Sequence, residues 1–326
     1  MLRIGVVIPF FQRRPGILAR ALASVAAQDD PAVSVIVVDD GSPVPASDEG
    51  LPAGLDVRLL TRPNAGPAAA RNTALEALDD SIAAVALLDS DDAWRPGHLA
   101  AARAALAAGA DLYFCDHAPK DADPDGGGGS HFTRKGFDAS RHPLIGQGPL
   151  RRFAGDFFDA QLRHYLAGTS TLVYRRARLA DIRFEPACAF AGEDSIFILD
   201  LARRTDRVAF SPAVGVVYGE GVNIWSGVGL RDRAIFRRCA DTLRGIAERR
   251  RRFPLTRGQE ASLRAYEAVQ AELLSEAAIW HARAGSLDLR QLGMALRTQP
   301  RMALAMARIL AHRAGGAFHR RLGGRP

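Results

Sequence analysis

The stretch Leu87-Leu88-Asp89-Ser90-Asp91-Asp92 places three carboxylates within four positions, directly after the apolar residues 83–88. The apolar residues have the length and composition of a buried strand, which the aspartates end abruptly. Carboxylates this close together repel one another unless a cation lies among them. The pattern therefore predicts a site for a divalent cation, Mg²⁺ or Mn²⁺, at a strand end.

The same aspartates also allow a purely structural interpretation. Asp91 or Asp92 could cap a helix that begins near Pro96 and His98, because aspartate is a favoured N-cap residue. A cap requires only one aspartate, so the presence of three favours the metal site.

A second apolar stretch, residues 33–38, ends in the same way at Asp39-Asp40-Gly41-Ser42. Strand and helix patterns alternate around both stretches, which predicts βαβ units and an α/β fold with a mostly parallel, Rossmann-like sheet flanked by helices. Ligands bind at the carboxyl ends of the strands in such sheets. Asp40 could therefore accept hydrogen bonds from a nucleotide base or ribose, although a glycine turn between a strand and a helix also explains this motif. The expected strands are residues 4–8, 33–38, 57–60, 83–88, 111–115, 171–174 and 208–218, and the expected helices are residues 16–28, 67–78, 97–107 and 195–204.

Charge divides the 326-residue chain unevenly. Residues 231–326 contain 20 arginines and 8 acidic residues, a net charge of +12, whereas the whole chain carries +7. We therefore expect a catalytic domain over residues 1–228 and a basic helical extension over residues 229–326. The basic extension suits anionic partners, but no nucleic-acid-binding motif is present, so we expect no nucleic acid partner.

The location of the protein is inferred from three further features. No window is apolar enough to span a bilayer, and the first strand lacks the pattern of a signal peptide. Three widely spaced cysteines indicate reduced thiols in a cytoplasmic protein. An apolar stripe near the C-terminus predicts either a helix packed on the catalytic domain or peripheral contact with the inner face of the cell membrane. The stripe consists of Met302, Met306, Ile309 and Leu310.

The motifs, taken in order, resemble those of the family 2 glycosyltransferases, which have the GT-A fold. The resemblance covers roughly residues 1–220. It implies metal-dependent transfer of one sugar, of the hexosyltransferase type, from a nucleotide-sugar such as a UDP-sugar to a sugar or lipid-linked acceptor, with inversion at the anomeric carbon. The matching pieces are Val7–Phe11, Ser24-Val25 through Gln28, Val37–Ser42, Asn64–Pro67 with Ala70-Arg71-Asn72, Leu88–Asp92 with Pro96, and Gly192-Glu193-Asp194.

The resemblance also implies roles for individual residues of the donor site. Pro9 and Phe11 would lie beside the base, which Asp40 would contact together with the ribose. Arg71, at the start of a helix after a Gly-Pro loop, would lie near the nucleotide. As a DXD motif, Asp91 and Asp92 would bind the metal with the donor's ribose and diphosphate, and Asp89 would complete the acidic turn. The alternative for Arg71 is a surface salt bridge.

Glu193-Asp194 are the predicted acid–base residues. An inverting transfer requires a general base to accept the proton of the attacking hydroxyl. The resemblance implies that this motif carries the base, with Asp194 as the first candidate and Glu193 as the second. Acidic residues are also favourable at the start of a helix, and the two roles are compatible.

Three further segments have less specific patterns, and two of them leave alternatives open. Gly168-Thr169-Ser170-Thr171 matches the acceptor side of the family's site or is a simple loop. Trp225 lies in a glycine-hinged stretch that predicts either a lid over a sugar or ordinary packing. Residues 120–149 are rich in Gly, Asp and Pro and are expected to form a mobile excursion.

Other functions remain as alternatives. A nucleotidyltransferase, or a non-catalytic module that binds sugar nucleotides, could have the same sheet. A nucleotidyltransferase would be expected to have a glycine-rich, basic loop after the first strand, where this chain has Pro9-Phe10-Phe11. A non-catalytic module would not need the Glu193-Asp194 pair. The Gln-x-x-Arg-Trp signature of processive synthases is absent, which favours transfer of one sugar per encounter in polysaccharide or glycoconjugate assembly.

Overall fold

The computed structural model describes residues 2–28, 33–119, 129–188, 192–219, 221, 228–298, 303–309 and 311. The chain forms two compact units, of which unit 1 comprises Met1–Ala189 and Glu193–Asn223. Unit 2 comprises Phe190–Gly192 and Ile224–Pro326. The main division lies between Asn223 and Ile224, and the charge pattern placed it between residues 228 and 229. Unit 1 contains all the residues that the sequence assigns to catalysis, to the metal and to the donor nucleotide.

Nine strands of unit 1 form one sheet among the described residues. The strands are β1 (Ile4–Phe10), β2 (Val33–Asp39), β3 (Asp56–Thr61), β4 (Ala84–Leu87), β5 (Ala93–Trp94), β6 (Leu112–Ala118), β7 (Arg151–Arg152), β8 (Val173–Arg175) and β9 (Val208–Val217). The helices of this unit are α1 (Ile17–Ala26), α2 (Pro67–Glu76), α3 (His98–Ala107), α4 (His131–Lys135), α5 (Phe157–His164), α6 (Arg176–Leu179) and α7 (Glu193–Arg204). Short 3₁₀ turns are η1 (Ala46–Asp48), η2 (Ala139–Arg141), η3 (Thr169–Thr171) and η4 (Pro186–Cys188).

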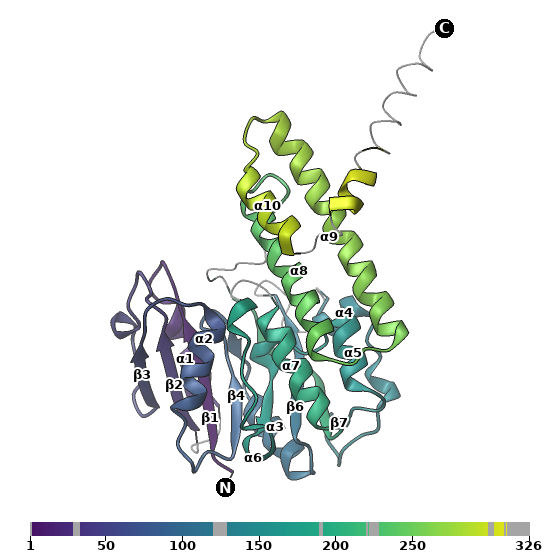
Figure 1. The fold of residues 1–326 in the computed structure, drawn as a ribbon. Helices are drawn as coiled ribbons and strands as arrows, with labels where there is room; N and C mark the ends of the chain where they lie inside the picture. The colour runs from purple at the N-terminus through teal and green to yellow at the C-terminus, as the bar shows by residue number, and fades with distance from the viewer. Residues whose placement is uncertain are drawn as a thin grey trace. The chain divides into compact units, whose positions relative to one another are not determined.

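The strand order is β3-β2-β1-β4-β8-β6-β9-β5, and β7 also pairs with β9. Figure 1 shows β3, β2, β1 and β4 in this order. Pairing is parallel across β3-β2-β1-β4 and between β6 and β9, and β8 lies antiparallel between β4 and β6. The predicted α/β fold with a Rossmann-like, mostly parallel sheet is confirmed. In the register, Phe10 pairs with Asp39 and Val7 with Leu87. The carboxyl ends of β1, β2 and β4 consequently meet at one edge of the sheet.

Successive residues of β1 face opposite sides of the sheet, and chain segments pack on both sides. Ile4 and Ile8 are fully buried in one apolar cluster with Leu22 of α1 and Leu99 of α3, so these helices cover one face. Gly5 points to the opposite face, where an added Cβ would be 2.5 Å from Leu78, just after α2. Only a glycine allows the segment after α2 to pack this closely on the sheet.

The structure of residues 129–149 differs from the expected mobile excursion. Residues 120–128 lie outside the described residues, but those that follow form α4 and η2 instead of a structureless excursion. Ser130 caps α4 through its hydroxyl, and the buried Phe132 contacts Phe114 of β6 edge to face. Glycine and aspartate content suggested a loop, but two phenylalanines, Phe132 and Phe137, anchor the segment in an aromatic cluster.

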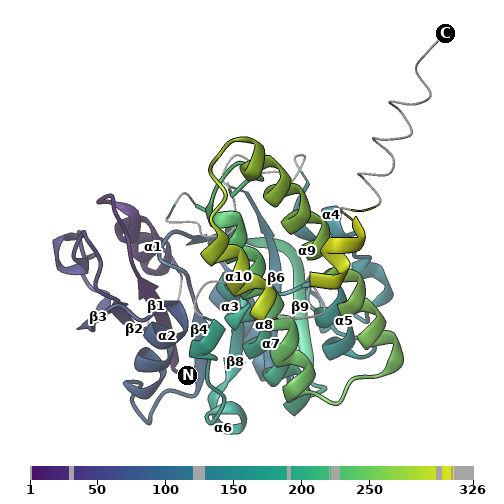
Figure 2. The same cartoon turned by 45° about the horizontal axis from the view of Figure 1, so that its top comes forward.

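Unit 2 is helical, as expected from its sequence. It contains α8 (Ala234–Arg252), α9 (Arg257–Arg283) and α10 (Leu289–Thr298), and residues 303–309 are also helical. Both α9 and α10 pack against α8 (Figure 2). Arg250 of α8 forms ion pairs with Glu260 and Glu267 of α9. Within the described parts of the chain, no helix combines the length and the apolar character needed to cross a bilayer.

Candidate active site

The acidic turn, residues Asp89–Asp92, follows β4 at the sheet edge that β1 and β2 share. The backbone N–H of Asp89 donates to the hydroxyl of Ser170, 3.0 Å away. That hydroxyl in turn donates to Asp92 Oδ2 at 2.6 Å, and the Gly219 N–H donates to Asp92 Oδ1 at 3.1 Å. The turn is therefore fixed by η3 and by the end of β9, two segments distant in sequence.

These aspartates do not cap the next helix. The N-cap of α3 is Gly97, with no side-chain capping bond, and β5 separates the acidic turn from that helix. The capping interpretation is therefore wrong. Carboxylates gathered here without a capping role are consistent with a ligand site.

Burial and mutual repulsion make the charges of the acidic turn unfavourable. Burial, together with the charge of Asp89, raises the pKa of Asp91 to about 6. Burial and the charges of both neighbours also raise the pKa of Asp92 well above its usual value. A divalent cation would relieve this repulsion.

The donor set suits a cation that shares its ligands with a phosphate. Hard carboxylate oxygens suit Mg²⁺ or Mn²⁺, and Mg²⁺ is usually held by one or two carboxylates plus substrate phosphates. Among the described residues no three His, Cys, Asp or Glu side chains are arranged to surround an ion by themselves. Asp92 is buried and Asp91 is half-buried, and both carboxylates accept hydrogen bonds from the protein. The residues therefore fit a metal–diphosphate complex better than a metal cage made of protein alone.

Two glycines allow the main chain to approach Asp91 closely. A Cβ added at Gly219 would collide with the Asp91 carbonyl oxygen, and one added at Gly221 would collide with the Asp91 carboxylate. The guanidinium of Arg20 in α1 donates to the same carbonyl oxygen. A larger residue at either glycine would have to displace the acidic turn.

The Asp39-Asp40 pair, after β2, holds two turns. Asp39 accepts hydrogen bonds from the backbone N–H groups of Ser42 and Ala46, at 2.7 and 2.8 Å. Asp40 accepts one from Gly66 at 2.7 Å and pairs with Arg62 at 3.2 Å. Asp40 thus fixes the loop that starts α2, and burial raises its pKa.

Pro9 and Phe11 occupy the neighbouring end of β1 and are half-buried. The register places Pro9 opposite Val38, and the Asp40 N–H donates to the Phe10 carbonyl at 2.9 Å. Pro9, Phe11 and Asp40 therefore lie on adjacent strand ends, as the assigned base-binding role requires.

Arg71 connects the two halves of the predicted site. Its guanidinium donates to Asp89 Oδ1 at 2.6 Å and to Glu193 Oε1 at 3.1 Å. The residue is only 4% exposed, so the alternative of a surface salt bridge is wrong. Burial alone would lower the pKa of Arg71, but the charges of Asp89 and Glu193 outweigh it and raise that pKa. Arg71 is therefore a buried cation that ties the acidic turn to the Glu-Asp pair.

The two members of the Glu-Asp pair differ in their surroundings. Glu193 is buried and bound to Arg71. Asp194 is half-buried; its Oδ1 accepts from the Ser195 N–H at 2.6 Å, and its Oδ2 accepts from the hydroxyl of Tyr165. Both begin α7, so the helix start and the assigned chemical role coexist. Asp194 is the more accessible of the two carboxylates.

Glu193 should make stability depend on pH. Burial, with the charge of Asp194, raises its pKa from 4.5 to about 7, against the opposing charge of Arg71. Between these values the folded protein keeps a proton that the unfolded chain releases, so stability present at low pH is lost as pH rises through about 7.

The Glu193→Gln variant should lack this contribution. Its free energy of unfolding is expected to fall less steeply between pH 4.5 and 7, with the slope reduced by up to about 1.4 kcal/mol per pH unit. Urea denaturation at several pH values measures both slopes. If the free energy of unfolding changes with pH in the same way in the native protein and the variant, Glu193 does not have the raised pKa assigned to it.

Several residues at the site were not found from the sequence. Ser170 was noted only within an acceptor-side segment or simple loop, but it is fully buried and bridges the backbone and side chains of the acidic turn. Gln12, Arg20 and Tyr165 carried no motif. Gln12 donates to Ser90 at 3.2 Å and so connects the loop after β1 to the acidic turn. Trp225, the predicted lid residue, lies outside the described residues.

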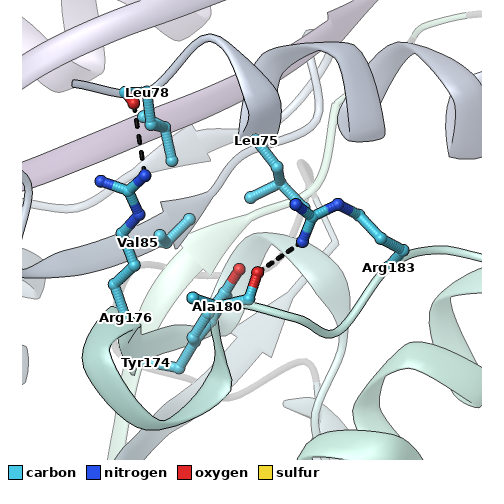
Figure 3. Close-up of a pocket in the computed structure, with 7 residues that line it drawn as sticks. All are labelled: Leu75, Leu78, Val85, Tyr174, Arg176, Ala180 and Arg183. Carbon is cyan, nitrogen blue, oxygen red and sulfur yellow. Dashed lines mark hydrogen bonds between the residues drawn. The ribbon is translucent and has the colours of Figure 1, made fainter. Parts of the chain in front are cut away.

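A small pocket elsewhere in unit 1 does not belong to this site. It has a volume of about 30 Å³ and lies beside Val85, near the amino end of β4, whereas the acidic turn follows the carboxyl end. Figure 3 shows its lining, in which Arg176 and Arg183 donate to the carbonyls of Leu78 and Ala180. A cavity of this size holds about one water molecule. It cannot bind a sugar nucleotide.

Comparison with known proteins identifies the class of enzyme. The model of the family described as Glycosyl transferase family 2 matches residues 5–178. Succinoglycan biosynthesis protein ExoW of Rhizobium meliloti (strain 1021) is 35% identical over 237 residues, which are 70% of this chain and 72% of that protein. The chain therefore belongs to glycosyltransferase family 2 and is a glycosyltransferase. A nucleotidyltransferase or a non-catalytic module is no longer an alternative.

Other similarities are more limited. The pre-mycofactocin glycosyltransferase of Mycobacterium tuberculosis is 43% identical over 98 residues, which are 29% of this chain and 19% of that protein. The crystal structure of S. aureus TarS 1-349 superposes with a TM-score of 0.53 at 16% identity and covers 93% of this chain and 81% of that one. The complex of the same TarS fragment with UDP-GlcNAc gives a TM-score of 0.52 at 18% identity over the same shares of each chain. These structures share the GT-A fold with this protein.

Proposed function

We propose that this glycosyltransferase transfers one sugar from a nucleoside-diphosphate-sugar to an acceptor hydroxyl, with inversion and with a divalent metal, in bacterial polysaccharide or glycoconjugate assembly. The observation that carries the proposal is the Asp89–Arg71–Glu193 chain of ion pairs, in which Arg71 and Glu193 are buried. It joins a carboxylate cluster suited to a metal–diphosphate complex to a carboxylate pair suited to acid–base work. Polysaccharide assembly is supported by the similarity to ExoW.

The acidic turn would bind the donor's diphosphate. When bound, Mg²⁺ or Mn²⁺ would supply positive charge to the diphosphate leaving group. Asp91 is the more exposed of the two predicted ligands, and Asp92 is held in place by Ser170 and Gly219. Pro9, Phe11 and Asp40 would contact the base and ribose at the adjoining strand ends.

Asp194 would serve as the general base. An inverting transfer needs a carboxylate that accepts the acceptor's proton while the hydroxyl oxygen attacks the anomeric carbon. Glu193 is buried against Arg71, whereas the half-buried Asp194 is accessible to an acceptor. Glu193 would instead set the orientation of Arg71.

The donor can be identified by a direct assay. Release of nucleoside diphosphate is measured with UDP-GlcNAc, UDP-glucose and UDP-galactose, each with Mn²⁺ or with EDTA and with water as the acceptor. TarS in complex with UDP-GlcNAc supports a UDP-sugar as the first choice. We expect at least one donor to release UDP only with Mn²⁺. Release that is equal in EDTA would contradict the metal-dependent mechanism.

We also propose peripheral contact of unit 2 with an anionic membrane, where a lipid-linked acceptor would be available. Leu289 is 72% exposed at the start of α10 and Leu304 is 64% exposed, in a region with a net positive charge. Met306, from the predicted stripe, is buried, whereas Met302 and Leu310 lie outside the described residues.

Vesicle binding tests this contact. The protein should co-sediment with phosphatidylglycerol vesicles at low salt and dissociate as salt screens its arginines. Leu289→Asp should weaken binding, whereas Leu51→Asp, at an exposed leucine of unit 1, should not. Equal binding to neutral phosphatidylcholine vesicles, or none to anionic ones, would rule out the proposed contact.

A further inference from the structure

Tyr165 has an unusual backbone conformation next to the predicted base. It follows α5 with φ = 50°, and among the described residues it is the only non-glycine residue with a positive φ. A bulky residue in the left-handed region is uncommon and persists only when its surroundings hold it there.

The surroundings of Tyr165 fix its main chain on both sides. The Nε2 atom of His131 lies 2.7 Å from the Tyr165 carbonyl oxygen. Two hydrogen bonds join Gln161 to the main chain of Ala167. Gln161 Nε2 donates to the Ala167 carbonyl at 3.0 Å, and the Ala167 N–H donates to Gln161 Oε1 at 2.9 Å. The loop after α5 is therefore held in a single conformation.

This conformation directs the Tyr165 hydroxyl to Asp194. The hydroxyl donates to Asp194 Oδ2, while the Ser195 N–H donates to Oδ1. Each carboxylate oxygen thus has one fixed donor and keeps a second lone pair. Burial, with the charge of Asp194, raises the pKa of Tyr165 well above its usual value, so the hydroxyl stays protonated as a donor.

We propose that Tyr165 is a positioning residue that holds the Asp194 carboxylate in one orientation. The inference rests on the proposed function, in which Asp194 is the base. Tyr165 exchanges no proton: the acceptor's proton passes to Asp194, and the phenol keeps its own.

The test compares Tyr165→Phe with Tyr174→Phe. Tyr174 is also buried, but it lies opposite Val85 near the amino end of β4, and its ring contacts Phe197 of α7. The readout is UDP release from the UDP-sugar selected by the donor assay, with Mn²⁺ and with water as acceptor. Tyr165→Phe should lower kcat about 10- to 100-fold, the usual cost of losing a hydrogen bond to a charged group. It should leave KM for the nucleotide-sugar unchanged.

The split between kcat and KM separates positioning from a purely structural role. Tyr174→Phe should leave both values unchanged. A Tyr165→Phe protein with native kcat would overturn the proposal, and so would one that unfolds or loses affinity for UDP.

Asp194→Asn distinguishes failure of this inference from failure of the proposed function. If Asp194→Asn is inactive while Tyr165→Phe behaves like the native protein, only the positioning role is wrong. If Asp194→Asn remains fully active, the assignment of the base is wrong regardless of the result for Tyr165.

Discussion

The Asp194→Asn variant is expected to release UDP about 10²- to 10⁴-fold more slowly than the native protein, the range that a general base contributes. The amide has nearly the shape of the carboxylate but cannot accept the proton of the attacking hydroxyl. Asp194 lies at the start of α7 and does not pair with Arg71, so the donor side of the site should remain intact. Affinity for UDP with Mn²⁺, measured by calorimetry, should therefore be unchanged.

A matched control is available on the surface of the same unit. Asp181→Asn removes a carboxylate that is 64% exposed and paired with the exposed Arg204. That variant should keep native activity. An Asp194→Asn protein with native kcat would show that another group acts as the base, and one that loses UDP affinity would show that Asp194 binds the donor.

The largest expected effect on stability comes from Arg71→Leu. Removing the guanidinium leaves Glu193 buried without its counter-ion and Asp89 without its 2.6 Å hydrogen bond. Breaking a buried ion pair by removing one partner costs about 3–5 kcal/mol, because the remaining charge is uncompensated. We expect the free energy of unfolding at pH 8, measured in urea, to fall by about this amount.

Two comparisons make the Arg71→Leu result specific. Arg204→Leu breaks an exposed pair with Asp181 and should leave the free energy of unfolding nearly unchanged. The loss caused by Arg71→Leu should shrink at pH 5, because Glu193, whose pKa is about 7, is then protonated. A loss equal to that of Arg204→Leu at pH 8 would contradict the account of Arg71 as a buried bridge.

The sequence predicted the part of the structure that depends on local pattern. Apolar stretches that end in Asp39-Asp40 and Asp89–Asp92 correctly predicted strands β2 and β4, and therefore the sheet edge where the site lies. Their alternation with helices was enough to predict the α/β class. The antiparallel insertion of β8 between β4 and β6 depends on long-range pairing and has no local signal.

The contacts that organise the site were not predictable from single motifs. Arg71 and Glu193 are separated by 121 intervening positions, and only the folded sheet brings them to 3.1 Å. Ser170 and Tyr165 act through a buried hydroxyl and an unusual φ value, neither of which leaves a pattern in the sequence. The motifs thus indicated the chemistry, and the fold supplied the partners of each group.

The most direct test of the central claim, that the acidic turn binds a metal–diphosphate complex, is the affinity for UDP with and without Mn²⁺. The calorimetry is done at pH 8, where Asp91, with its pKa of about 6, is ionised. The account predicts that Mn²⁺ raises the UDP affinity of the native protein at least about tenfold, a gain of about 1.4 kcal/mol, and that Asp91→Asn abolishes this gain. Equal UDP affinity in Mn²⁺ and in EDTA, or an undiminished gain in Asp91→Asn, would contradict it.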